Sequence, residues 1–236
     1  MNYEGKIILI TGAYRGIGKN LLDCFIKCKA KVIITYHNHY DETLILKEKY
    51  NSQIDMVYLD LCDENSVKEM FNYVKEKYQK IDILINNAAL SLDNDIENKT
   101  KEEFMEVLET NVVGTFLMMK YFDNIVDGYI FNISSTDGID TGNIYSIDYN
   151  ASKAGINSIT RTFAMYSKNK IISICPNWVD TESTKEMDKS YLDSELKRIN
   201  QNKLINPRSV FKAIDNCIKN NIPTGSIIRI DGDIND

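Results

Sequence analysis

At positions 11–18 the chain reads Thr-Gly-Ala-Tyr-Arg-Gly-Ile-Gly, and the rest of the sequence is organised around this stretch. It follows the apolar run Lys6–Ile10, which is typical of a buried parallel strand, and precedes apolar residues at helical spacing. The glycines therefore lie at a strand-to-helix turn, where they let a ligand approach the backbone. The unpaired N–H groups and positive dipole end of the helix favour a phosphate. We expect a dinucleotide site, rather than a plain structural turn, with these residues among its contacts: Gly12, Tyr14, Arg15, Gly16, Ile17 and Gly18.

The length and composition of the chain are those of an ordinary globular protein. Its 236 residues are 43% hydrophobic and 26% charged, which predicts a single domain over 1–236 with a full core. The net charge of −6 and the lack of a basic run argue against binding nucleic acid or a membrane surface. Without an apolar signal-peptide core or an apolar run of membrane-spanning length, we expect a cytoplasmic protein. The five cysteines are widely spaced and predict structural thiols, with no metal site.

Short apolar segments alternate with amphipathic ones along the whole chain. The predicted strands are Lys6–Ile10, Lys31–Thr35, Asp55–Leu59, Ile81–Ile85, Tyr129–Ile133, Lys170–Ile174 and Ser226–Ile230. The predicted helices are 17–28, 41–51, 64–78, 100–124, 150–168 and 208–220. This alternation predicts an α/β fold with a doubly wound, Rossmann-type, seven-stranded parallel sheet, helices on both faces, and ligands at the carboxyl ends of the strands. The region 181–206 has no clear strand and is predicted as a substrate-side lid.

The end of the second strand bears on the choice of cofactor. A site for NAD usually places an acidic residue about 20 residues beyond the glycines, to bond the ribose 2′-hydroxyl. Here the strand is followed by Tyr36, His37 and Asn38, with no carboxylate. Arg15 is either a solvated loop charge or a partner for a 2′-phosphate. Together these observations favour NADP(H) over NAD(H), with residues 36–38 lining the same pocket.

Two further strand ends carry candidate nucleotide contacts. Asp60 and Leu61 follow the third strand, where a carboxylate could meet an adenine amino group. The alternative, a helix-capping aspartate, applies to Asp63 more than to Asp60. Asn87, Ala88 and Ala89 follow the fourth strand. Small residues and amides there suit close approach of a nucleotide, although they also suit any turn.

In order and spacing, five motifs together resemble the short-chain dehydrogenase/reductase family over essentially the whole chain. They are Thr11-Gly12-x-x-x-Gly16-x-Gly18, Asn86-Asn87-Ala88-Ala89, Asn111, Ile133-Ser134-Ser135 and Tyr149-x-x-x-Lys153. The glycine turn is similar to that of 3-oxoacyl-carrier-protein reductases, which use NADPH. The resemblance implies an NADP(H)-dependent oxidoreductase that acts on a small carbonyl compound or secondary alcohol.

Tyr149 and Lys153 lie four residues apart and share one helix face. A free tyrosine has a pKa of about 10. A nearby ammonium and the positive nicotinamide ring are expected to lower the pKa of Tyr149, so that it exchanges a proton with the substrate oxygen while hydride moves at carbon. Ser135 can hydrogen-bond the same oxygen. The resemblance further implies that Lys153 holds the nicotinamide ribose and that Asn111 holds a water in a proton relay. Without the other motifs, Tyr149 and Lys153 could equally be two solvent-exposed residues on one face of a helix.

The segment after the sixth strand departs from the family pattern. The resemblance places Pro176, Asn177, Val179 and Thr181 beside the nicotinamide, but the family usually has glycine at position 177. Asparagine tolerates a positive φ, so we expect the turn to survive. Trp178 either walls the substrate pocket or belongs to the core. These departures motivate the alternative function, a non-catalytic dinucleotide-binding regulator or scaffold.

Other chemistries and partners can be weighed in the same way. A Ser/His/Asp hydrolase is excluded because the two histidines, His37 and His39, both follow the second strand. No basic residue occurs over 124–127, before the fifth strand, which argues against an acidic carrier-protein partner.

A homodimer or homotetramer through helices 100–124 and 149–168 is expected, because these carry more apolar residues than one buried face needs: Phe104, Val107, Leu108, Phe116, Met118, Met119 and Tyr121.

Overall fold

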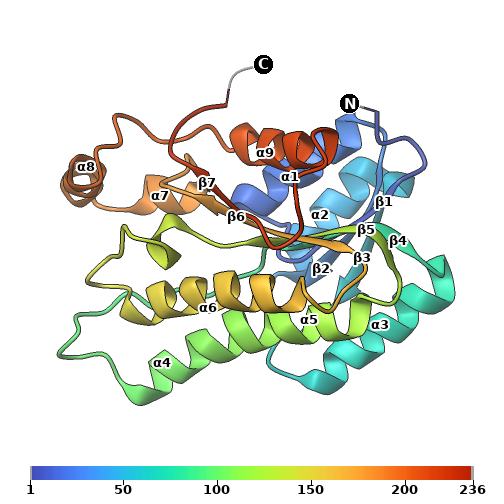
Figure 1. Cartoon of the computed structure of the whole chain (residues 1–236), viewed down its shortest axis with the longest axis horizontal. Helices are drawn as coiled ribbons and strands as arrows, with labels where there is room; N and C mark the ends of the chain where they lie inside the picture. Colours follow the sequence, from blue (N-terminus) through green and yellow to red (C-terminus); the bar gives the residue numbers. More distant parts are fainter. Residues whose placement is uncertain (1, 235–236) are drawn as a thin grey trace.

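The computed structural model describes residues 2–234 and arranges them around one parallel sheet (Figure 1). The strands are β1 (Ile7–Ile10), β2 (Lys31–Tyr36), β3 (Ile54–Tyr58), β4 (Ile81–Asn86), β5 (Val126–Ile133), β6 (Lys170–Pro176) and β7 (Ile227–Ile230). Their order across the seven-stranded sheet is β3-β2-β1-β4-β5-β6-β7, which confirms the predicted fold class. The order reverses between β1 and β4, so the connections diverge there and leave a crevice at the carboxyl ends.

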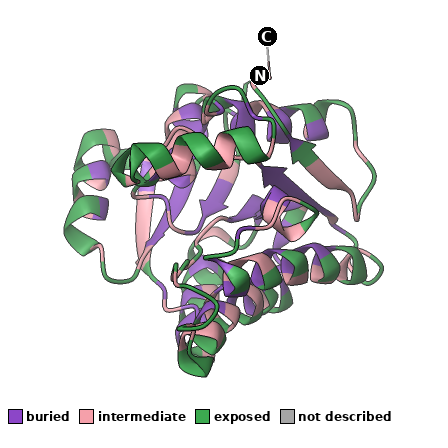
Figure 2. Ribbon diagram, turned by 90° about the vertical axis from the view of Figure 1, so that its left-hand side faces the viewer, coloured by how far each residue is buried: buried purple, intermediate pink, exposed green. Residues whose placement is uncertain are grey.

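Helices cover both faces of the sheet, as Figure 1 shows. One face carries α1 (Gly16–Lys27), α2 (Tyr40–Tyr50) and α9 (Arg208–Lys219). The other carries α3 (Glu64–Tyr78), α4 (Lys101–Leu108), α5 (Gly114–Phe122) and α6 (Ile147–Phe163). Each face has its own apolar cluster, so the strands are buried on both sides and the outward helix faces are exposed (Figure 2). This double cover explains why the strands read as continuous apolar runs.

The predicted helix 100–124 is interrupted. Thr100 and Glu103 form a capping box at the start of α4, and a π-helical turn, Glu109–Val113, separates α4 from α5. Such turns occur mostly as single insertions, frequently at functional sites. Here the turn contains Asn111, one of the predicted catalytic residues.

The region 181–206 forms two short helices, α7 (Glu182–Glu186) and α8 (Lys189–Arg198). The Thr181 side chain caps α7, accepting a hydrogen bond from the N–H of Thr184. A bridge between Val179 and Ile205 joins the two ends of the segment. Its role as a lid stays a prediction.

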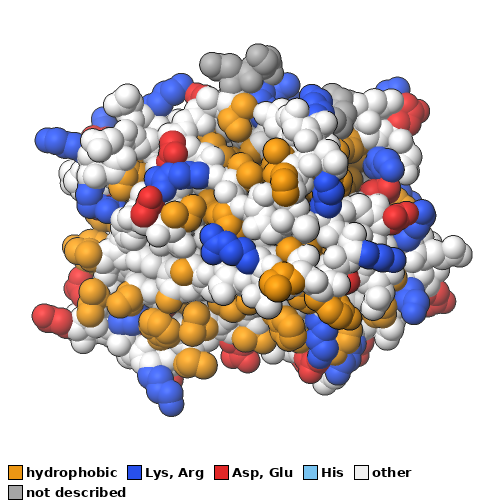
Figure 3. Space-filling model, in the orientation of Figure 1, with side chains coloured by type: hydrophobic (Ala, Val, Ile, Leu, Met, Phe, Trp, Pro, Cys, Tyr) orange, Lys and Arg blue, Asp and Glu red, His pale blue; other side chains and the backbone are white. Residues whose placement is uncertain are grey.

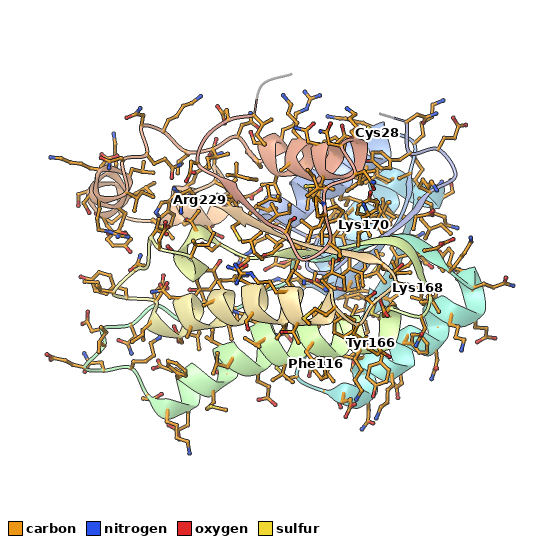
Figure 4. All side chains as sticks on the ribbon, viewed as in Figure 1. Cys28, Phe116, Tyr166, Lys168, Lys170 and Arg229 are labelled. Atoms are coloured by element: carbon orange, nitrogen blue, oxygen red, sulfur yellow. The ribbon has the colours of Figure 1, made fainter. Side chains whose placement is uncertain are left out.

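Exposed apolar side chains gather over the helical side that carries α4, α5 and α6 (Figure 3). Of the residues predicted for association, Val107, Met118 and Met119 are buried inside the chain, whereas Phe116 is exposed. Phe116 and Tyr166 are labelled on this side in Figure 4. The homo-oligomer stays a prediction. Over residues 2–234, no helix is both long enough and apolar enough to cross a membrane.

Candidate active site

A cavity of about 470 Å³ opens at the carboxyl ends of the central strands. The predicted residues that line it are Arg15, Ile17, Asn87, Ala89, Ser135, Tyr149, Lys153, Pro176, Asn177, Val179 and Thr181. The others lie behind it or along the nucleotide side, outside its lining: Gly12, Tyr14, Gly16, Gly18, Tyr36, His37, Asn38, Asp60, Leu61, Ala88 and Asn111. The cavity thus brings the glycine turn, the end of β4 and the predicted catalytic tyrosine together.

The glycine turn is locked to the end of β4. Thr11 Oγ1 accepts hydrogen bonds from the N–H groups of Asn87 and Ala88, at 2.9 and 3.0 Å. The Asn87 amide in turn donates to the Gly12 carbonyl at 2.9 Å. Gly12 has a φ of +65°, and a Cβ there would lie 2.9 Å from the Cα of Ala88. Only glycine meets both conditions, so this approach depends on the residue type found in the sequence.

The start of α1 suits the phosphates of a dinucleotide. The helix has no acidic residue in its first turn and no side-chain cap at Arg15, so its positive end is not neutralised by its own residues. The sequence did not reveal that Glu182 reaches this point: the Gly16 N–H donates to its Oε2 at 3.0 Å. Hydrogen bonds from its own N–H and from that of Gly16 hold the pKa of Glu182 below its ordinary value. The two residues are 166 positions apart, so no local pattern predicts the contact.

The region beyond the glycine turn, where the sequence predicts that the adenosine binds, is rich in aromatic rings. Tyr14 stacks on His39 with ring centroids 4.0 Å apart, and the Arg15 guanidinium lies 5.3 Å from the Tyr14 centroid. His37 Nε2 lies 3.7 Å from Asp60 Oδ2. The helix-capping role that was the alternative for Asp60 is taken by Asp63, whose side chain accepts from the N–H of Asn65. His39 was not among the predicted contacts, although its position beside His37 could have suggested it.

Tyr149 and Lys153 lie one turn apart on α6, as predicted. Lys153 Nζ is 5.1 Å from the centre of the Tyr149 ring and donates to the Ile133 carbonyl at 2.8 Å. The Ser134 hydroxyl donates to the Lys153 carbonyl at 2.9 Å, which ties α6 to the end of β5. Gly138 allows the chain after β5 to pack on the helix, because a Cβ there would lie 2.4 Å from the Lys153 carbonyl carbon. These contacts fix the lysine and tyrosine relative to the strand ends.

The hydroxyl groups of Ser135 and Tyr149 face the same cavity. Ser135 Oγ accepts from the N–H of Asp137 at 3.1 Å, which leaves its own proton to donate. Within residues 2–234 the Tyr149 hydroxyl has no hydrogen-bond partner. The cavity lining therefore includes two residues with O–H groups that can donate to a ligand, the kind of donor that polarises a carbonyl.

Burial shifts the pKa values of both Tyr149 and Lys153. Burial raises the pKa of Tyr149 above its ordinary value, and the carboxylates of Asp137 and Asp93 raise it further. Burial also lowers the pKa of Lys153 to about 8. This shift reflects the protein's own residues, and the lowering expected from the Lys153 ammonium together with the positive nicotinamide ring stays a prediction. Tyr149 is therefore protonated near neutral pH and holds a proton that it can give to a carbonyl oxygen.

Asn111 is fully buried and lies behind the cavity. Its side-chain oxygen accepts from the N–H of Leu90 at 2.7 Å, and its amide donates to the Leu90 carbonyl and to Ser152 Oγ at 2.8 and 2.9 Å. The side chain thus joins the segment after β4 to α6. A water relay through Asn111 stays a prediction.

In the segment after β6, the backbone conformation of Asn177 differs from the predicted one. The residue does not adopt a positive φ; instead its side-chain oxygen accepts from Thr136 Oγ1 at 2.7 Å, and its N–H donates to the Ile230 carbonyl at 3.0 Å. These two bonds hold the turn without the conformation that favours glycine. Trp178, left open between core and pocket, lines the cavity.

Comparison with known proteins identifies the family. The family described as short chain dehydrogenase matches residues 6–192. This chain is a short-chain dehydrogenase. It is 31% identical to the 3-oxoacyl-[acyl-carrier-protein] reductase FabG of Thermotoga maritima over 98% of each chain, and 28% identical to that of Vibrio cholerae over 91% of this chain and 90% of the other. The solved structure titled "ElxO with NADP Bound" matches with a TM-score of 0.85 and 30% identity, over 96% of this chain and 97% of that one. This short-chain dehydrogenase is therefore an oxidoreductase that uses a nicotinamide dinucleotide.

The buried ammonium of Lys153 leads to a prediction about stability. Its exposed fraction is 2%, and its pKa falls from 10.5 to about 8, which corresponds to roughly 3 kcal/mol against the charged form. Replacing Lys153 with methionine also removes the hydrogen bond to Ile133, a loss of about 1 kcal/mol. We expect Lys153→Met to raise the free energy of unfolding by about 2 kcal/mol at pH 7, as measured by urea unfolding.

The lowered pKa of Lys153 also determines how the stability of the protein changes with pH. Because the folded pKa lies below the unfolded one, the unfolded chain binds more protons between about pH 8 and 10.5, so Lys153 makes stability rise with pH across this window. Lys153→Met should lack that contribution, whereas the exposed control Lys168→Met should keep it. A Lys153→Met protein that is less stable than the wild type at pH 7 would contradict the predicted cost of the buried charge.

Proposed function

We propose that this short-chain dehydrogenase is NADP(H)-dependent and interconverts a carbonyl and a secondary alcohol, with Tyr149 as the general acid and base. The observation that carries the proposal is the shared cavity of Ser135 and Tyr149, with Lys153 one turn below. A regulator that only binds a dinucleotide would not require two hydroxyl donors in the lining of that cavity. We therefore favour catalysis over the alternative of a regulator or scaffold.

In the direction of reduction, a nicotinamide held beside Lys153 and Asn177 would supply hydride to the carbonyl carbon. Tyr149 gives its phenolic proton to the carbonyl oxygen, which becomes the alcohol hydroxyl. Ser135 donates a hydrogen bond to the same oxygen and stabilises the charge that develops there. Lys153 lies near enough to stabilise the phenolate that remains, and burial strengthens that attraction. In oxidation the same residues act in reverse.

The relatives supply candidate substrates. Two of them are named as 3-oxoacyl-[acyl-carrier-protein] reductases, so a 3-oxoacyl thioester belongs in the first panel of candidate substrates. We propose testing that thioester beside simple ketones and aldehydes, with NADPH and NADH, by absorbance at 340 nm. Turnover of any carbonyl supports the proposed function. Tight cofactor binding with no turnover across the panel would favour the regulator instead.

Cofactor choice can be tested at Arg15. A charge-assisted contact to a 2′-phosphate contributes about 1.5–3 kcal/mol, or roughly ten- to a hundredfold in affinity. We expect the wild type to bind NADPH more tightly than NADH, and we expect Arg15→Ala to remove much of that difference while leaving the NADH affinity nearly unchanged. Titration of both cofactors by intrinsic fluorescence measures all four affinities. Lys19→Ala, in the first turns of α1, is a matched control for loss of one positive charge. Equal affinities in the wild type would show that the end of β2 does not select for the phosphate.

A further inference from the structure

Two carboxylates lie at the substrate end of the cavity. Asp93 belongs to the loop after β4, and Asp137 to the short turn after β5; both line the cavity together with Tyr149. One oxygen of each is held by neighbouring hydroxyl groups. Ser146 donates to Asp93 Oδ1 at 2.5 Å, and Thr141 donates to Asp137 Oδ1 at 2.6 Å. The hydroxyl groups fix where the two negative charges point.

Neither carboxylate forms a direct ion pair with a described residue of the surrounding chain. Among residues 2–234, neither Asp93 nor Asp137 forms an ion pair, and neither Oδ2 atom accepts a hydrogen bond. Arg198 and Lys153 lie close enough to Asp137 for its negative charge to favour their protonated forms, but neither pairs with it directly. Arg198 pairs with Glu195 at 2.7 Å, and the buried Lys99 pairs with Asp148 at 2.8 Å.

The charges of the cavity are separated along its length. The positive side chains in its lining are Arg15, on the nucleotide side, and Lys153, beneath Tyr149. The substrate end carries only negative ones. A ligand that fills this end displaces water from both carboxylates, and only hydrogen-bond donors or a positive charge replace that hydration. An anionic ligand would instead meet like charges at short range.

We propose that the natural substrate carries a positively charged nitrogen, which Asp137 and Asp93 bind while the carbonyl lies at Tyr149 and Ser135. This inference rests on the proposed function, because it places the cation in the pocket where reduction occurs. Asp137 contributes more than Asp93, since Asp137 is half-buried and Asp93 is exposed at the rim. The two residues therefore select substrates by charge.

The test uses methyl ketones that share one three-carbon chain and end in trimethylammonium, hydroxyl or carboxylate. Their binding to the NADP⁺-loaded protein is measured by calorimetry, and kcat/KM is measured with NADPH. We expect the cation to exceed the hydroxyl compound about tenfold in both measurements, with the carboxylate weakest. Asp137→Asn keeps an acceptor for Thr141 and should reduce the preference to about twofold. Asp95→Asn, an exposed charge outside the cavity lining, should leave the preference intact.

The outcomes separate this inference from the proposed function. Binding of the cation without reduction of any ketone would support the charge selection and count against the proposed function. Reduction of the hydroxyl or carboxylate compound in preference to the cation would leave the proposed function standing and overturn the inference. No binding of the cation, equal binding of the compounds, or an unchanged preference in Asp137→Asn would also overturn it.

Discussion

Replacing Tyr149 with phenylalanine is expected to lower kcat for carbonyl reduction about 10²–10⁴-fold, the usual contribution of a positioned general acid. Phenylalanine keeps the ring above Lys153, 5.1 Å from its Nζ in the wild type, and removes the proton that the carbonyl oxygen would receive. The affinity for NADPH should stay within about twofold, because the change leaves the glycine turn and the Lys153 contacts in place. Stopped-flow reduction at saturating ketone and NADPH, with fluorescence titration of the cofactor, measures both quantities.

Tyr145 provides the matched control. It precedes α6, its ring lies 5.8 Å from that of Tyr191, and it is outside the cavity lining. Tyr145→Phe removes the same atom from a neighbouring tyrosine and should change kcat by less than about twofold. Normal turnover in Tyr149→Phe, or a comparable loss in both variants, would show that another group supplies the proton.

The sheet and the placing of Tyr149 and Lys153 on one helix face could be predicted because both have local signatures in the sequence. A parallel strand buried on both faces must be apolar at nearly every position, so runs such as Ile81–Ile85 are visible without tertiary information. The spacing of Tyr149 and Lys153 fixes their shared face once a helix is assumed. The glycine turn is similarly local, since Gly12 is required by its own φ and by the neighbouring Ala88.

Features that depend on distant contacts were not predicted. The break in helix 100–124 centres on Asn111, whose partner Leu90 lies 21 residues away. The raised pKa of Tyr149 results from burial and from Asp137 and Asp93, which the sequence places far from α6. The direction of that shift could not follow from the Tyr149–Lys153 spacing, because spacing does not report how much water the folded chain excludes.

The segment that follows β4 is held to α6 by a buried ion pair. Lys99 Nζ lies 2.8 Å from Asp148 Oδ2, and the exposed fractions of the two side chains are 4% and 0%. Lys99 also donates to the Leu92 carbonyl, and Asp148 Oδ1 accepts the N–H of Tyr149 at 2.8 Å. The pair thus links the loop that carries Asp93 to the helix turn that carries Tyr149.

Breaking this pair should have the largest effect on stability. Lys99→Met leaves the Asp148 carboxylate buried without a counter-charge, which costs about 3–5 kcal/mol and lowers Tm by roughly 10 °C for a chain of this size. The double variant Lys99→Met/Asp148→Asn removes the unpaired charge and keeps an acceptor for the N–H of Tyr149, so it should recover most of the loss. Lys101→Met, which removes an exposed lysine two positions away, should change stability by less than about 0.5 kcal/mol. Calorimetric unfolding of the three variants and the wild type measures these differences in stability. A double variant no more stable than Lys99→Met would mean that packing of the lysine stem, and not the buried charge, holds the loop to α6.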